Sequence, residues 1–279
     1  MPSIDYGFGA RRSVFAPLLG NGIFTQEGLP WKHSRELLRK QFSRMQYQNL
    51  DHFREHVDNL IALLPVDGVV DLQPLFFKLT LDTATALLFG RSVYSLRANI
   101  DQDAGNRLFA ESFTIAQEGL AKRFRIAPWH FLYSPREFRQ ACSTVHRFVE
   151  RYLEDLDLQH EILEEKTFNF IKQVVNESGS KVEVRDQLLN VLLAGRDTTA
   201  CCLSWTLYVL ADRLILFSIR LIFILCSRLL VRHTHVMDRL RREVKSIMGE
   251  SEHPTREQIR KMPYLACIIK ESGFLEVIR

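Results

Sequence analysis

A mainly α-helical fold is predicted for this chain of 279 residues. Apolar residues recur at helical spacing in one stretch after another, and no series of alternating strand patterns separates these stretches. The stretch at residues 186–210 carries apolar residues on every side, so we expect a central helix packed by neighbours all round. A composition of 46% hydrophobic and 25% charged residues is that of a folded globular protein, in one or two domains with a sizeable core.

Periodicity and helix-ending residues divide the chain into successive expected helices. The glycine-rich residues 1–29 lack such periodicity and are expected to form loops. Pro30 begins the first helix, where its missing N–H costs little, and Gly90 follows the end of the third. We expect helices at residues 30–45, 51–64, 71–89, 109–120, 134–158, 160–175, 186–210 and 236–244, followed by a helical segment within 251–272. An aromatic stretch at 124–133, FRIAPWHFLY, is expected to pack in the core.

Charge and cysteine content exclude several classes of function. A net charge of +4, without zinc-ligand spacing or a nucleic-acid-binding module, predicts no nucleic-acid partner. Five scattered cysteines suit a reducing compartment better than a disulfide framework, and the first residues carry no signal-peptide pattern or anchor. No metal site formed by side chains is expected, because His52 and His56 are four residues apart but have no third ligand. We interpret both as surface residues.

The centre of residues 186–210 carries the residues that a buried helix tolerates least, namely Gly195, Asp197, Thr198 and Thr199. A glycine inside a helix costs about 1 kcal/mol relative to alanine. A buried carboxylate costs several kcal/mol more unless it is paired or hydrogen-bonded. Two interpretations are open: a functional site at the middle of the helix, or a core helix whose Asp197 pairs with a buried arginine.

The helix at residues 30–45 places Trp31, Arg35, Leu38 and Phe42 close to one face. One interpretation is an amphipathic surface helix with a basic edge. The other is an anion site, because an indole N–H and a guanidinium both donate hydrogen bonds to carboxylates.

The hexapeptide Ala194-Gly195-Arg196-Asp197-Thr198-Thr199 resembles the oxygen-binding helix of the cytochrome P450 haem-thiolate monooxygenases. The likeness is greatest to fungal enzymes that hydroxylate alkanes and fatty acids. The resemblance implies that Ala194 and Gly195 lie against the haem face. It also implies that Asp197 and Thr198 are catalytic residues that manage protons during cleavage of O2.

The spacing Trp31-x-x-x-Arg35, preceded by LLGNGIF, resembles the helix of the same family that holds the haem propionates. The family resemblance therefore implies haem as cofactor and a small apolar substrate, a fatty acid or an alkane. It implies electrons from an NADPH-dependent flavoprotein reductase and a place at the endoplasmic reticulum membrane. The resemblance also implies that the helices expected at residues 109–120 and 134–158, which the stretch 124–133 joins, roof the substrate chamber.

On this resemblance the fold is the helical core portion of the cytochrome P450 fold, without the cysteine-ligand loop and the N-terminal sheet region. Residues 1–213 form a partial monooxygenase domain and residues 232–272 continue it. Residues 214–231 form an apolar insertion, and residues 273–279 a divergent tail.

The expected insertion is apolar at 14 of its 18 positions, with Arg220 and Arg228 among them. It is long enough to be a membrane candidate, although arginines are costly at the centre of a bilayer. The alternative to an enzyme is therefore a non-catalytic, truncated helical protein that associates with membranes through residues 214–231.

Glu271 is a remnant of the family's Glu-x-x-Arg pair, since Phe274 stands where the arginine is expected. None of the five cysteines lies in a loop of the type Phe-x-x-Gly-x-x-x-Cys-x-Gly, which supplies the thiolate ligand of the haem iron in this family. The thiolate drives O–O cleavage. We therefore expect the chain as written to be inactive as a monooxygenase.

Overall fold

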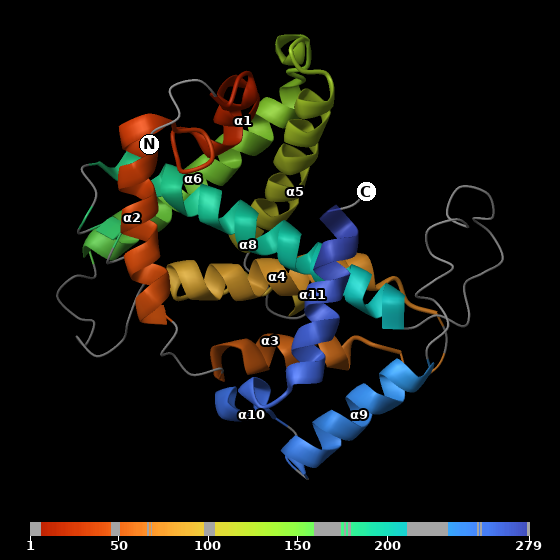
Figure 1. Ribbon diagram of the computed structural model, residues 1–279. Coiled ribbons are helices and arrows are strands. Elements are labelled where there is room, and N and C mark those ends of the chain that lie inside the picture. Colours follow the sequence, from red (N-terminus) through yellow and green to blue (C-terminus); the bar gives the residue numbers. More distant parts are fainter. Residues whose placement is uncertain are drawn as a thin grey trace. The chain divides into compact units, whose positions relative to one another are not determined.

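The structure is a computed structural model, shown as a ribbon in Figure 1. It describes residues 7–45, 51–65, 67, 69–97, 104–158, 174–175, 177, 180–210, 234–249, 251 and 253–277. These residues form helices and connecting loops, with no strand among them. The predicted mainly α fold class is confirmed.

The helices follow the predicted order, with ends that shift by a few residues. They are α1 (Arg11–Leu19), α2 (Gly28–Met45), α3 (Asp51–Ala62), α4 (Leu72–Phe89), α5 (Ala104–Arg125), α6 (Arg136–Leu158), α8 (Lys181–Leu210), α9 (Thr234–Met248), α10 (Arg256–Arg260) and α11 (Pro263–Val277). Short 3-10 turns occupy Ser95–Arg97 and His130–Leu132. Most of the helix expected at 160–175, and all of the expected insertion at 214–231, lie outside the described residues.

The prediction of loops throughout residues 1–29 is wrong, because Arg11–Leu19 forms α1. This helix buries Val14 and Leu18 almost completely. The glycines that suggested a loop stand outside the helix, and Gly20 forms its C-cap with a φ of 57°. Tertiary burial of a short apolar face therefore outweighs the glycine-rich composition of the region.

Two compact units share the chain. The first contains residues 1–48 and 78–196, and the second contains residues 49–77 and 197–279. The division falls within α8, after Arg196.

The core of the first unit centres on α5 and α6, which lie side by side (Figure 1). The rings of Phe109 and Phe148 stack with their centroids 4.1 Å apart. Close approach of the two helices depends on Gly119, since a Cβ there would lie 2.1 Å from the Phe138 ring. Leucines of α1, α2, α4 and α8 complete the same cluster.

Arg123 ties α1 to the segment after α5 from inside this core. Its guanidinium donates to the carbonyl oxygens of Ser13, Val14 and His130 at 3.1 Å and of Tyr133 at 2.8 Å. Only 6% of Arg123 is exposed, and this burial lowers the pKa of its guanidinium. Charge-assisted bonds to carbonyls are the compensation that a buried guanidinium requires.

The aromatic stretch at 124–133 does not pack in the core as expected. Phe124, Trp129 and Phe131 are 58%, 63% and 62% exposed. The core beneath is already filled by residues of α5 and α6, so the connection between the two helices projects its rings outward. The implied role of α5 and α6 as a roof over a substrate chamber stays a prediction.

In the second unit, α9 fixes the start of α11. The Glu243 carboxylate accepts hydrogen bonds from the backbone N–H groups of Tyr264 and Leu265, both at 2.9 Å. The interpretation of His56 as a surface residue is wrong, because its side chain is only 2% exposed on α3. Its position on the apolar side of an amphipathic helix, near Leu60, explains the burial.

No group of three or more metal-ligating side chains occurs among the residues that the structure describes. Within the same residues, none of the helices combines the length and the apolar character needed to span a bilayer.

Candidate functional site

α8 carries the centre of the candidate site. It begins at Lys181, five residues before the predicted start, because Ser180 caps it: the Ser180 hydroxyl accepts a hydrogen bond from the Glu183 N–H at 3.2 Å. Leu188, Leu189 and Leu192 in its first half are fully buried. The helix remains continuous through the hexapeptide to Leu210.

The hexapeptide lies on a part of α8 that is open on one side. Gly195, Thr198 and Thr199, which share one helical face, are exposed, whereas Ala194 and Asp197 are half-buried. The prediction of a helix buried on every side is therefore wrong for this stretch. Among the described residues, a Cβ added at Gly195 would meet only the Cβ of Ala84, at an ordinary 3.8 Å. Packing within the described chain thus does not require glycine at this position.

Arg196 fixes the rotation of α8 about its axis. It is 6% exposed, and its guanidinium donates to Thr114 Oγ1 at 2.9 Å and to Gln117 Oε1, both on α5. The same guanidinium lies 5.3 Å from the centre of the Phe113 ring. With Arg196 turned toward α5, the neighbouring Gly195 points about 100° away around the helix. The sequence argument assigned no role to this arginine.

α2 brings Trp31 and Arg35 together. The Arg35 guanidinium carbon lies 5.7 Å from the centre of the Trp31 ring, and both side chains are exposed. Within the described residues, Arg35 has no carboxylate partner at ion-pair distance. The buried side of α2 consists of Ser34, Leu37, Leu38 and Gln41. The expected shared face is therefore only partly correct, because Phe42 is 42% exposed and Leu38 is buried.

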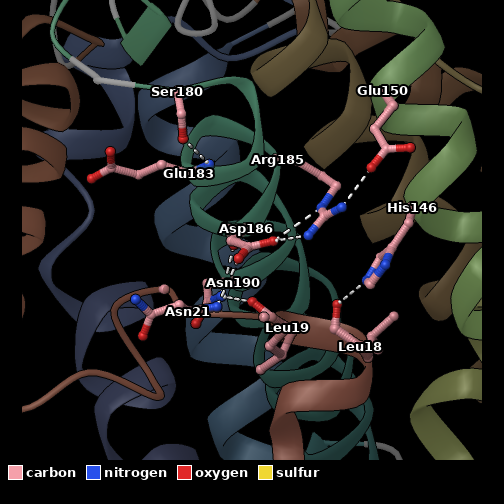
Figure 2. Close-up of polar contacts among 12 residues, drawn as sticks. Leu18, Leu19, Asn21, His146, Glu150, Ser180, Glu183, Arg185, Asp186 and Asn190 are labelled. Carbon is pink, nitrogen blue, oxygen red and sulfur yellow. Dashed lines mark hydrogen bonds and ion pairs between the residues drawn. The ribbon is translucent and has the colours of Figure 1, made fainter.

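The loop that leads into α2 is bound by side chains of α8 (Figure 2). Three of them accept hydrogen bonds from its backbone N–H groups: Asp186 Oδ2 from Asn21 at 2.7 Å, Gln187 Oε1 from Ile23 at 3.2 Å, and Asn190 Oδ1 from Phe24 at 2.9 Å. Figure 2 shows the side chains of Asp186 and Asn190 beside this loop. In addition, Asn190 Nδ2 donates to the Leu19 carbonyl oxygen at 2.9 Å. Sequence reasoning missed these residues, although three polar side chains beside the leucines at 188, 189, 192 and 193 are a detectable signal.

A charged cluster continues from Asp186 toward α6. Asp186 Oδ1 accepts from the Arg185 guanidinium at 2.7 Å, and the same guanidinium pairs with Glu150 (Figure 2). Burial lowers the pKa of Arg185, but the hydrogen bonds and charges of the two carboxylates outweigh it, so the pKa is raised. Arg185 therefore stays charged and links α6 to α8.

His146 joins α6 to the end of α1. Its Nε2 lies 2.8 Å from the Leu18 carbonyl oxygen, so this nitrogen carries the donated proton. Burial lowers the pKa of His146, and Arg185 lowers it further, whereas the bond to Leu18, Asp186 and Glu150 raise it in part. The net shift is downward, so the imidazole is neutral in the folded protein at pH 7.

The stability of the protein is expected to fall on acidification because of His146. Its pKa is about 6.5 in the unfolded chain and lower in the folded one, so below pH 6.5 the unfolded state binds more protons. The His146→Gln variant keeps a donor toward Leu18 but does not titrate. Urea unfolding at pH 7.5 and 5.5 should therefore show a larger loss of stability in the wild type than in the variant. Equal losses would contradict the assignment.

The described cysteines all lie within helices. Burial raises the pKa of the Cys142 thiol on α6 to about 12, so this residue is a poor thiolate. Cys201 and Cys202 on α8 are half-buried, and Cys267 on α11 is exposed. Cys226 lies outside the described residues. Glu271 is exposed on α11.

Comparison with known proteins gives a consistent family match. A family model described as Cytochrome P450 matches residues 7–214 and 218–272. A cytochrome P450 of Arthroderma benhamiae is 42% identical over 262 residues, which are 90% of this chain and 48% of that protein. Cytochrome P450 52A13 of Debaryomyces hansenii is 37% identical over 284 residues, 96% of this chain and 51% of the relative. Cytochrome P450 monooxygenase himC of Aspergillus japonicus is 34% identical, with 96% and 46% covered. The chain thus spans about half the length of the curated relatives it matches.

The family match also touches the expected insertion. Residues 215–217, between the two matched segments, fall inside it, but the second segment includes residues 218–231. The boundaries at 1–213, 214–231, 232–272 and 273–279 stay predictions.

Proposed function

Because the chain belongs to the cytochrome P450 family, we propose that it contributes the oxygen-binding and propionate-binding helices of a haem-dependent monooxygenase. The observation that carries the proposal is the open face of α8 at Gly195. A glycine that internal packing does not require, beside half-buried Ala194, lets one side of a planar porphyrin approach the helix backbone closely.

The residues of α2 also fit this cofactor. Trp31 and Arg35 present an indole N–H and a guanidinium on an exposed face, and both donate to carboxylates such as propionates. When bound, haem would supply the iron chemistry that activates O2 for insertion of one oxygen atom into an apolar substrate. Asp197 and Thr198 would hold and pass protons at the carboxylate and the hydroxyl on the neighbouring turn of α8.

The substrate class, the electron donor and the location are part of the proposal. They rest on the likeness of the hexapeptide to fungal alkane and fatty-acid hydroxylases. The substrate would be a fatty acid or an alkane, and the electrons would come from an NADPH-dependent flavoprotein reductase. The site of action would be the endoplasmic reticulum membrane.

We further propose that the polypeptide of residues 1–279, expressed by itself, does not oxygenate substrate, because its described cysteines lie in helices and not in a ligand loop. The test is to add haem to this polypeptide and record the spectrum of the reduced, carbon monoxide-bound form. We expect bound haem without the red-shifted Soret band of thiolate ligation. That band, accompanied by oxygenated product, would contradict inactivity, and absence of haem binding would contradict the proposed function itself.

Replacement of Arg35 with alanine is expected to weaken haem binding by about 10- to 100-fold, the equivalent of one charge-assisted hydrogen bond. The measurement is a haem titration followed by absorbance in the Soret region. The matched control is Arg39→Ala, which removes another exposed arginine one turn further along α2. Equal effects of the two variants would mean that general positive charge, not Arg35, retains the haem.

Replacement of Thr198 with alanine is expected to uncouple NADPH oxidation from product formation by at least about tenfold, since proton delivery would be disturbed. The experiment requires an active form, such as residues 1–272 fused to the remaining half of cytochrome P450 52A13. Thr199→Ala on the same exposed face is the control. Unchanged coupling in the Thr198 variant would remove this residue from the mechanism.

A further inference from the structure

The loop that connects α1 to α2 packs closely against the first half of α8. A Cβ at Gly20 would lie 2.1 Å from Asp186 Oδ2, and a Cβ at Gly22 would lie 2.2 Å from Asn190 Nδ2. Real side-chain carbons do not approach polar atoms so closely. The loop backbone therefore reaches α8 only because both positions are glycine.

The α8 side chains that bind this loop are buried, and their polar groups form hydrogen bonds. Asp186 is 3% exposed, and Gln187 and Asn190 are fully buried. Polar groups at such depth are costly unless they are hydrogen-bonded. Here their acceptors take up the backbone N–H groups of three loop residues, so the arrangement of the loop is tightly specified by these three side chains.

The same network extends into α2 itself. Gln187 Nε2 donates to Ser34 Oγ at 2.6 Å, and Ser34 Oγ donates to Gln26 Oε1 at 2.6 Å. Ser34 is 1% exposed and immediately precedes Arg35. With Ser34 held inward, Arg35 is turned about 100° around the helix axis, toward the exposed face that it shares with Trp31.

We propose that Asp186, Gln187 and Asn190 are positioning residues that set the placement and the rotation of α2, and thereby the orientation of Trp31 and Arg35. As far as it concerns haem, this inference rests on the proposed function. One helix then presents Gly195 to the cofactor and, two turns earlier, holds the segment that carries the propionate donors. These residues contact neither haem nor substrate. They act through the backbone of the loop and through Ser34.

The experiment makes two measurements on the full chain of 279 residues. Amide hydrogen exchange, read by mass spectrometry, follows residues 20–35 without haem, and a haem titration gives the dissociation constant. The variants are Gln187→Met, which removes both hydrogen bonds, and Asn190→Ala. The isosteric variants Gln187→Glu and Asn190→Asp retain the acceptors for the loop N–H groups and keep the test usable if the first two fail to fold.

We expect Gln187→Met and Asn190→Ala to speed exchange in residues 20–35 and to weaken haem binding, each by about tenfold, since two and three side-chain hydrogen bonds are lost, respectively. The isosteric variants should fall between these and the wild type. The matched control, Leu192→Ala, removes a fully buried side chain of α8 that is not part of the polar network. It should lower the thermal midpoint without selective exchange in the loop.

The inference would be overturned by loop exchange that stays at the wild-type rate in the polar variants, or by faster loop exchange with unchanged haem affinity. A loop effect of Leu192→Ala equal to that of the polar variants would also overturn it, because general destabilisation would then explain the result. If the wild type binds no haem, the proposed function fails. The inference is then decided by exchange in residues 20–35 alone.

Discussion

Replacement of Arg123 with alanine is expected to lower the free energy of unfolding by about 3–5 kcal/mol, because buried carbonyl acceptors are left unsatisfied at roughly 1–3 kcal/mol each. Four backbone carbonyls, from α1 and from the turn after α5, lose a charge-assisted donor at once. A buried site of this kind cannot simply refill with bulk water. Urea unfolding followed by circular dichroism measures the change.

The control for this prediction is another arginine that also binds a carbonyl. Arg139 is exposed on α6 and donates to the Ser134 carbonyl oxygen. Because water can replace this donor, Arg139→Ala should change stability by no more than about 0.5 kcal/mol. Similar losses for the two variants would mean that burial of Arg123 does not determine its contribution.

Replacement of Gly20 with alanine is expected to lower the free energy of unfolding by about 3 kcal/mol. Gly20 adopts φ 57° and ψ −135°, a backbone conformation that is nearly restricted to glycine and costs alanine about 1–3 kcal/mol, and crowding against Asp186 adds to this cost. The clash also displaces the carboxylate from the Asn21 N–H. Thermal or urea unfolding of the full chain provides the measurement.

Gly9 separates the two contributions. Its φ of 58° matches that of Gly20, but a Cβ there would meet nothing within 4 Å. Gly9→Ala should therefore cost about 1 kcal/mol, from the backbone alone. If both variants lose the same stability, contact with Asp186 plays no part.

Sequence periodicity predicted the helices well because their apolar faces are long. α4, α6 and α8 follow directly from such patterns. α1 was not predicted, because it is short, its sequence shows little helical periodicity, and it is stabilised by burial against the other helices. The burial of His56 was missed because the surface assignment rested on its spacing from His52, and not on its position four residues before the buried Leu60.

Only the local motifs of the candidate site could be predicted from the sequence. The hexapeptide and the Trp31–Arg35 spacing are local motifs, so sequence alone could single them out. The hydrogen bonds of Asp186 and Asn190 join residues more than 160 positions apart in the chain. No local pattern reveals such partners, and only the fold shows that they bind backbone groups.

The binding of the α1–α2 loop through its backbone has a consequence for how this protein tolerates change. Asp186 recognises the amide of residue 21, while the Asn21 side chain itself points to solvent. The loop conformation therefore depends little on which side chain stands at position 21, whereas it requires that positions 20 and 22 have no side chain. Substitutions in this loop would therefore be tolerated mainly at the solvent-facing position 21. A substitution at Gly20 or Gly22 would require a compensating change at Asp186 or Asn190, respectively.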